Sequence, residues 1–134
     1  MKKLLNKIII FFTLIVLCAC EAQFKESELV GTYKANHGKG EDIIVLKEGG
    51  KYLHSFKTLE KTFEREGVWE YEIFEDEPLI SFYNFQHRWE DNYYTYKKDE
   101  RNIWPAFIER SIFGKITLPL DDDLGFYYEK VLVK

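Results

Sequence analysis

TFEREGVWEYEIF, residues 62–74, alternates between two kinds of side chain with a period of two. Apart from Arg65, one parity is apolar or glycine, while the other carries four glutamates: Glu64, Glu66, Glu70 and Glu72. Because successive side chains of a strand point to opposite faces, this pattern predicts a long strand with one buried and one wet face, typical of antiparallel sheets. Gly67 in its middle predicts a bend or a β-bulge.

The segments on either side of this strand also read as β-structure. Asp42–Leu46 and Lys51–Phe56 are predicted strands joined by Lys47-Glu48-Gly49-Gly50, in which the glycines favour a tight hairpin turn. After Pro78, the continuous apolar run Leu79–Phe85 predicts a strand buried on both faces. Residues 42–85 thus supply four consecutive strands.

Further short strands complete the predicted sheet. They are expected at Leu29–Tyr33, Ala106–Ile112, Lys115–Leu118 and Phe126–Leu132, the last two separated by the turn Asp121-Asp122-Asp123-Leu124-Gly125. No long stretch has the 3.6-residue spacing of an amphipathic helix. Since closure removes exposed sheet edges, we predict an all-β fold, a small antiparallel barrel of approximately eight strands.

Two short motifs lie in this strand order. Gly31-Thr32-Tyr33 opens the first strand and Gly67-Val68-Trp69 lies in the middle of the longest one. With the order of elements from residue 29 to 131, they resemble small lipocalin-like bacterial lipoproteins. That resemblance implies a barrel that holds a small apolar ligand or a lipid.

The side chains of the predicted interior give a candidate ligand site. Tyr52, His54 and Phe56 share one strand face, so His54 would project a polar group into an aromatic interior. The candidate ligand-binding residues are Tyr52, His54, Trp69 and Tyr71. The alternative is that these rings simply fill a narrow barrel, with His54 as a hydrogen-bonded core residue.

The N-terminus reads as an export leader. Lys2, Lys3 and Lys7 surround the start of an apolar run, Ile8–Leu17, which has the length of a signal-peptide h-region and is too short to span a bilayer. Leu17-Cys18-Ala19-Cys20 resembles the lipobox of bacterial lipoproteins. This resemblance implies a signal peptide over residues 1–19, acylation (palmitate) on the sulfur of Cys20, and attachment to a membrane of the cell envelope, the outer membrane in a diderm organism. The alternative is an ordinary secretory signal cut near Ala22.

Three segments follow from this organisation: the signal peptide, a lipidated tether over residues 20–28 and one barrel domain over residues 29–134. Both cysteines of the chain, Cys18 and Cys20, lie at the cleavage site, so the domain would be stabilised by packing without a disulfide. The formal net charge is −4, and removal of the leader takes away three lysines and no acid. An acidic chain excludes a nucleic-acid partner, because that binding depends on Lys and Arg.

No motif predicts catalysis, a metal or a cofactor. His37, His54 and His87 lack the spacing of a zinc pair, and no serine lies in a nucleophile elbow. The triple aspartate 121–123 lacks the alternation of a calcium loop, which favours a solvated turn over a cation site. We therefore expect a binding protein and not an enzyme.

Two classes of binding function remain open. The first is a membrane-anchored, non-enzymatic lipoprotein that binds a small apolar ligand or a lipid. The second is a protein-interaction module, such as an inhibitor or immunity protein against a toxin or lysozyme-like enzyme, whose acidic face at Glu64–Glu72 would complement a basic partner. The predicted loop 87–102 adds a candidate interaction rim of four aromatic residues: Trp89, Tyr93, Tyr94 and Tyr96.

Overall fold

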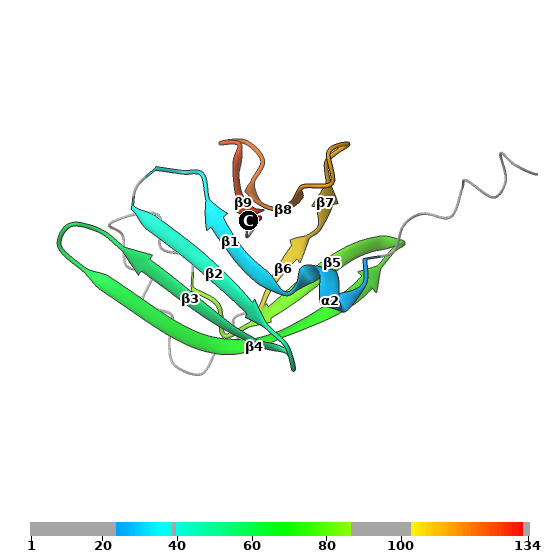
Figure 1. Cartoon of the computed structure of the whole chain (residues 1–134), viewed down its shortest axis with the longest axis horizontal. Helices are drawn as coiled ribbons and strands as arrows, with labels where there is room; N and C mark the ends of the chain where they lie inside the picture. Colours follow the sequence, from blue (N-terminus) through cyan, green and yellow to red (C-terminus); the bar gives the residue numbers. More distant parts are fainter. Residues whose placement is uncertain (1–23, 39, 87–102, 133–134) are drawn as a thin grey trace, which may run out of the picture.

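The computed structural model describes residues 24–38, 40–86 and 103–132 (Figure 1). This part of the chain is nearly all β, with one helical turn and nine strands, which confirms the predicted class. The elements are α2 (Glu26–Leu29), β1 (Gly31–Ala35), β2 (Glu41–Lys47), β3 (Lys51–Lys57), β4 (Thr62–Phe74), β5 (Glu77–Tyr83), β6 (Ile103–Phe107), β7 (Glu109–Arg110), β8 (Ile116–Asp121) and β9 (Phe126–Lys130).

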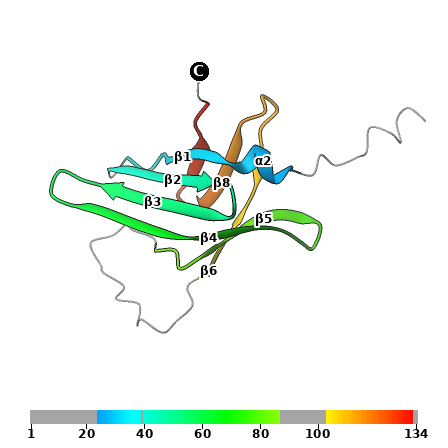
Figure 2. The same ribbon diagram turned by 60° about the horizontal axis from the view of Figure 1, so that its bottom comes forward.

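All strand pairs are antiparallel and form one sheet in the order β6-β5-β4-β3-β2-β1-β9-β8-β7. Its two ends are halves of the same segment, because only Ile108 separates β6 from β7. Residues 103–107 pair with β5, residues 109–110 pair with β8, and the Ile108 amide donates to the Pro78 carbonyl at 2.9 Å. The sheet therefore curls into a nearly closed barrel, as predicted (Figures 1 and 2).

Most predicted elements are present with changed bounds: β5, for example, is Glu77–Tyr83 where Leu79–Phe85 was expected. The predicted strand Ala106–Ile112 is divided between β6 and β7, so the barrel has nine strands and not eight. The predicted first strand begins two residues late because Leu29 belongs to α2, where it is buried and its carbonyl accepts the Tyr33 hydroxyl at 2.8 Å. The β2–β3 hairpin is confirmed, with positive φ angles of 80° at Gly49 and 73° at Gly50.

The barrel interior is packed with aromatic rings. Phe82 meets Tyr52 edge to face at 5.3 Å between centroids and stacks on Trp104 at 4.9 Å. Phe85 lies 4.6 Å from Trp104, and Trp104 lies 5.9 Å from Tyr128. Since ring pairs at such distances gain energy beyond their buried area, this cluster supplies packing that a disulfide-free barrel needs.

Gly67 has a steric role that the sequence did not predict. The β3–β4 register runs through the pair Tyr52↔Gly67 without a shift, so the predicted β-bulge is wrong. A Cβ atom built on Gly67 would lie 2.5 Å from Cε1 and Cζ of the Tyr52 ring. The glycine is thus required because the Tyr52 ring lies directly on the backbone of β4.

Replacing Gly67 with alanine should lower the free energy of unfolding by about 1–3 kcal/mol, because the added methyl overlaps the Tyr52 ring. The direction of the stability change is informative, since a Gly→Ala substitution inside an unobstructed strand usually stabilises the protein. Urea denaturation measures the change. The control is Val68→Ala at the next position, where the side chain is half exposed and a change within about 0.5 kcal/mol is expected. Equal effects of the two substitutions would contradict the steric explanation.

Candidate functional site

The structure places the four candidate ligand residues inside the barrel. Tyr52, His54 and Trp69 are buried, and Tyr71 is partly buried. The Tyr52 hydroxyl donates to the Tyr83 carbonyl at 2.9 Å and the Trp69 indole donates to the Lys47 carbonyl at 3.1 Å. Two of the four polar groups are thus used to tie strands together. The candidate rim residues Trp89, Tyr93, Tyr94 and Tyr96 lie outside the described residues.

The other two candidates each carry a buried polar atom without a hydrogen-bond partner: Nδ1 of His54 and the hydroxyl of Tyr71. These atoms lie far apart along the barrel. His54 pairs with Arg65, and Tyr71 follows six residues later on the same strand, a separation of about 20 Å at the usual rise per residue. The two atoms therefore cannot contact one small ligand together.

A buried cluster centred on Asp42 holds one end of the barrel. Its Oδ1 lies 2.8 Å from Nε2 of His54, and its Oδ2 lies 2.9 Å from Nε2 of His37. The Tyr128 hydroxyl also donates to Oδ2, at 2.9 Å. Asp42 lies on β2, His54 on β3 and Tyr128 on β9, while His37 follows β1. One carboxylate thus joins four segments.

The donors of this cluster are all directed at the carboxylate. An acceptor carboxylate requires a proton on Nε2 of both imidazoles, while Nδ1 of His54 has no hydrogen-bond partner and its ring stacks against Phe85 at 4.6 Å. The Asp42 and His37 side chains are only 4% and 2% exposed. A shielded cluster whose donors are already used is suited to stabilising the fold.

Sequence reasoning identified His54 but missed Asp42. The signal was present, because Asp42 has the parity of Ile44 and Leu46 and therefore points into the barrel with them. An acidic residue on the buried parity requires partners, and His37, His54 and Tyr128 provide them.

The Asp42 cluster gives folding a defined dependence on acid. Burial raises the pKa of the Asp42 carboxyl, but the hydrogen bonds from His54, His37 and Tyr128 outweigh burial and hold that pKa below its usual value of 3.8. The stability from Asp42 is therefore fully present above pH 3.8 and is lost as pH falls through the lowered native pKa. The stability difference between wild type and Asp42→Ala, measured by urea denaturation, should narrow below that pH. A difference that stays constant down to the native pKa would contradict this linkage.

Among the described residues, no group of three or more His, Cys, Asp and Glu side chains is arranged to hold a metal ion. The aspartate turn is an ordinary reverse turn: Asp121 Oδ1 accepts the Leu124 amide at 3.1 Å, and Gly125 has a φ of 65°. No helix in the described part of the chain is long and apolar enough to cross a membrane.

The outer face of β4, β5 and β6 combines apolar and acidic side chains in three cross-strand rows. The residues of these rows, in strand order, are Val68, Tyr83 and Ile103; Glu70, Ser81 and Pro105; and Glu72, Leu79 and Phe107. Neighbouring strands lie about 4.8 Å apart. On β5, Ser81 and Leu79 are only 6% and 4% exposed and Tyr83 is partly buried, so the exposed side chains of the rows lie mainly on β4 and β6. We call these nine residues the outer patch.

Charge and exposure are unevenly divided across the outer patch. Val68, Ile103 and Phe107 are 48%, 49% and 42% exposed, while Glu70 and Glu72 present their carboxylates along β4. The Tyr83 hydroxyl donates to Glu70 Oε2 at 2.9 Å, and this hydrogen bond raises the pKa of Tyr83. The outer patch is therefore an exposed apolar strip along β6 with an acidic border on β4.

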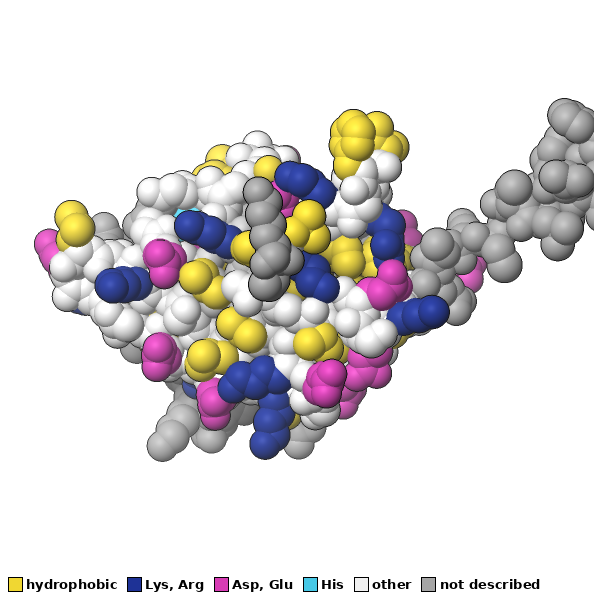
Figure 3. Space-filling model, in the orientation of Figure 1, with side chains coloured by type: hydrophobic (Ala, Val, Ile, Leu, Met, Phe, Trp, Pro, Cys, Tyr) yellow, Lys and Arg dark blue, Asp and Glu magenta, His cyan; other side chains and the backbone are white. Residues whose placement is uncertain are grey.

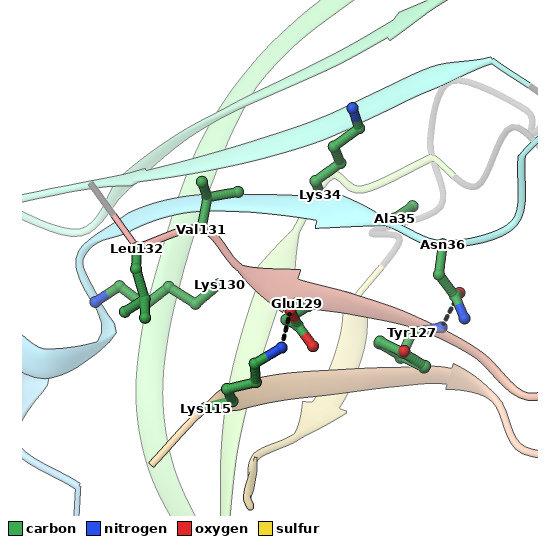
Figure 4. A pocket seen from close by; sticks show the side chains of 9 residues that line it. All are labelled: Lys34, Ala35, Asn36, Lys115, Tyr127, Glu129, Lys130, Val131 and Leu132. Carbon is green, nitrogen blue, oxygen red and sulfur yellow. Dashed lines mark hydrogen bonds and ion pairs between the residues drawn. The ribbon is translucent and has the colours of Figure 1, made fainter. Parts of the chain in front are cut away.

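A shallow depression of about 420 Å³ lies elsewhere, on the outside of β1, β8 and β9 (Figure 4). It is lined by Lys34, Lys115, Lys130, Val131 and Leu132, among others. Lys115 pairs with Glu129 at 2.8 Å, and Asn36 Oδ1 accepts the Tyr127 amide at 2.9 Å. The depression is thus bordered by lysines and by the apolar end of the described chain.

Comparison with protein families, with curated proteins and with solved structures gives no match to this chain. The function is therefore inferred from the geometry of the barrel.

Proposed function

We propose that the chain is an envelope lipoprotein, acylated at Cys20, whose barrel binds a protein partner through the outer patch. The observation that carries the proposal is the outer patch itself, where Ile103, Pro105 and Phe107 are exposed on β6, two strands away from the exposed Glu70 and Glu72 carboxylates on β4. Exposed apolar strips with a polar border are typical of recognition surfaces. The barrel would thus act by outward contact and without catalysis.

The filled interior supports recognition on the outside. Tyr52 and Trp69 use their polar atoms within the barrel, and the rings of Phe82, Phe85 and Trp104 occupy the space between the strands. A small-molecule pocket needs a concave apolar space with converging polar groups. The two unpartnered polar atoms, on His54 and Tyr71, do not converge.

The chemistry of the outer patch defines the partner class. An apolar centre with basic residues at its border would cover Val68 and the β6 strip while its cations face Glu70 and Glu72. Opposite charges at the border speed association with a basic partner and select against acidic proteins. A basic toxin or lysozyme-like enzyme, bound by an inhibitor or immunity protein at the cell envelope, fits this description.

The test is capture of the partner from envelope extracts of the native cell, followed by binding measurements with the purified partner. The double substitution Ile103→Ser and Phe107→Ser should weaken binding by about 30-fold, the effect of losing a central interface contact worth about 2 kcal/mol. Charge reversal at Glu70 and Glu72 should slow association and reduce its dependence on salt.

Leu59→Ser is the matched control, because Leu59 is fully exposed in the β3–β4 turn and outside the outer patch. It should leave affinity unchanged. A partner that binds the double variant as tightly as wild type would contradict the proposed surface. Intact mass of the native protein tests the anchor: an unmodified polypeptide that begins after Cys20 would contradict acylation.

A second candidate follows from the lipocalin-like order of strands: binding of a small apolar ligand or a lipid inside the barrel. The observation that favours it is the buried hydroxyl of Tyr71, which has no hydrogen-bond partner within the described residues. Organic-solvent extraction of the native protein and mass spectrometry of the extract distinguish the candidates. A stoichiometric apolar molecule would support the second candidate, and an empty extract would support the first.

A further inference from the structure

We propose that the β7–β8 turn inserts into the lipid bilayer and fixes the orientation of the barrel on the membrane. The inference rests on the acylation of Cys20 proposed above and adds a second point of contact. We call the residues 111–114 between Arg110 and Lys115 the β7–β8 turn.

Two adjacent bulky apolar side chains lie at this turn. Ile112 is 94% exposed and Phe113 is 86% exposed. In Figure 3 apolar side chains cover the end of the turn, which projects from the body of the barrel. Single exposed apolar residues are common on protein surfaces, but an adjacent pair on a projecting turn marks a contact with another apolar phase.

The turn holds these side chains outward by its own hydrogen bonds. The Ser111 hydroxyl oxygen accepts the amides of Phe113 and Lys115 at 3.3 and 3.1 Å, and the Ser111 amide donates to the Lys115 carbonyl at 2.9 Å. Gly114 has a φ of 78° and donates its amide to the Ser111 carbonyl at 2.9 Å. The turn is thus pre-formed without any contact from Ile112, so insertion requires little ordering.

The base of the same hairpin contacts the segment that follows the proposed anchor. The Arg110 guanidinium lies 4.5 Å from the centre of the Phe24 ring, and Nη2 of Arg110 lies 3.3 Å from Oε1 of Glu28. Cys20 precedes Phe24 by four residues, which span at most about 14 Å. An acyl chain on Cys20 and the side chain of Phe113 can therefore enter one membrane surface.

The end of β9 projects to the same side as this turn, whereas the β8–β9 turn lies at the other end of β8 (Figure 2). Val131 and Leu132, at the end of β9, are 44% and 73% exposed. Lys34 lines the adjoining depression and, within the described residues, has no carboxylate at ion-pair distance, whereas Nζ of Lys130 donates to the Glu28 carbonyl. A lysine beside exposed apolar residues fits an anionic bilayer surface.

The experiment uses the full acylated protein in vesicles of phosphatidylcholine and phosphatidylglycerol. Phe113→Cys is labelled with a polarity-sensitive fluorophore, since Cys18 leaves with the leader and the Cys20 sulfur carries the acyl chain, so the new thiol is unique. The emission should shift to the blue on reconstitution, and most of it should be lost when spin-labelled lipid is included.

Leu124→Cys is the matched control, since Leu124 is 62% exposed but lies on the β8–β9 turn. Its probe should keep the emission of water and resist the lipid quencher. Ile112→Cys serves as a second probe, and unchanged thermal unfolding verifies that each variant folds. Wild-type flotation with the vesicles tests the anchor separately. Flotation with Phe113 and Ile112 probes that behave like the Leu124 probe would overturn this inference alone, while loss of flotation would overturn the anchor as well.

Discussion

Asp42→Ala should lower the free energy of unfolding by about 3–5 kcal/mol, because it leaves the donors of His37, His54 and Tyr128 buried without their acceptor. The total free energy of unfolding of a small domain is about 5–15 kcal/mol, so this loss is a large fraction of its stability. Urea denaturation near neutral pH measures the change. The segments after β1 and in β2, β3 and β9 would lose their common contact.

Two further variants test whether the loss of stability comes from the buried cluster or would follow from removing any aspartate. Tyr128→Phe removes one donor to the carboxylate and should cost about 1.5–3 kcal/mol. Asp121→Ala removes an exposed turn aspartate whose Oδ1 accepts the Leu124 amide, and it should cost about 1 kcal/mol or less. If Asp42→Ala were no more destabilising than Asp121→Ala, the buried cluster would not hold the barrel together.

Alkaline pH should unfold the barrel steeply. Burial raises the pKa of Tyr52 to about 12 and raises the pKa values of Tyr33 and Tyr128 as well, the last also through the neighbouring Asp42 carboxylate. A raised native pKa means that stability is fully present below the unfolded value of 10 and is lost as pH rises above it. Three tyrosines together predict a fall of about 4 kcal/mol per pH unit between pH 10 and 12.

Urea denaturation across this range, together with tyrosinate absorbance, measures the effect. Tyr52→Phe should reduce the slope by about one third, because one of the three buried hydroxyls is removed. Tyr127→Phe is the control, since Tyr127 lies on the outside of β9 beside the depression and should leave the slope unchanged. Stability that stays constant from neutral pH to about pH 11 would contradict the burial of these hydroxyls.

The sequence predicts the bounds of a strand well where one face of the strand is exposed to solvent. The bounds of β4 agree with the predicted Thr62–Phe74, since four glutamates mark one face throughout. The division at Ile108 could not be predicted, because it depends on which strand each half of residues 103–110 meets in space. The steric role of Gly67 could not be predicted for the same reason: the Tyr52 ring that lies on it comes from another strand.

The candidate site was less accessible to sequence reasoning. His54 was identified from its aromatic neighbours, but its partner is Asp42, which also accepts from His37 and Tyr128. These two residues are 17 positions before and 74 positions after His54 in the sequence, so strand pairing alone brings the cluster together. Only part of the outer patch could be predicted from the sequence. Glu70 and Glu72 belong to the predicted acidic face, whereas Phe107 joins them only through the β5–β6 register.

Pairing of β1 with β9 joins the first and last strands of the described chain, as in the contact between Asn36 and Tyr127, 91 residues apart in the sequence. Contacts of such long range make folding slow and place the closing step late, after the last strand has emerged from the ribosome. For a chain that crosses a membrane unfolded, delayed closure is useful. Under the export proposed above, the domain would stay unfolded during translocation and would fold only after its last strand has reached the far side.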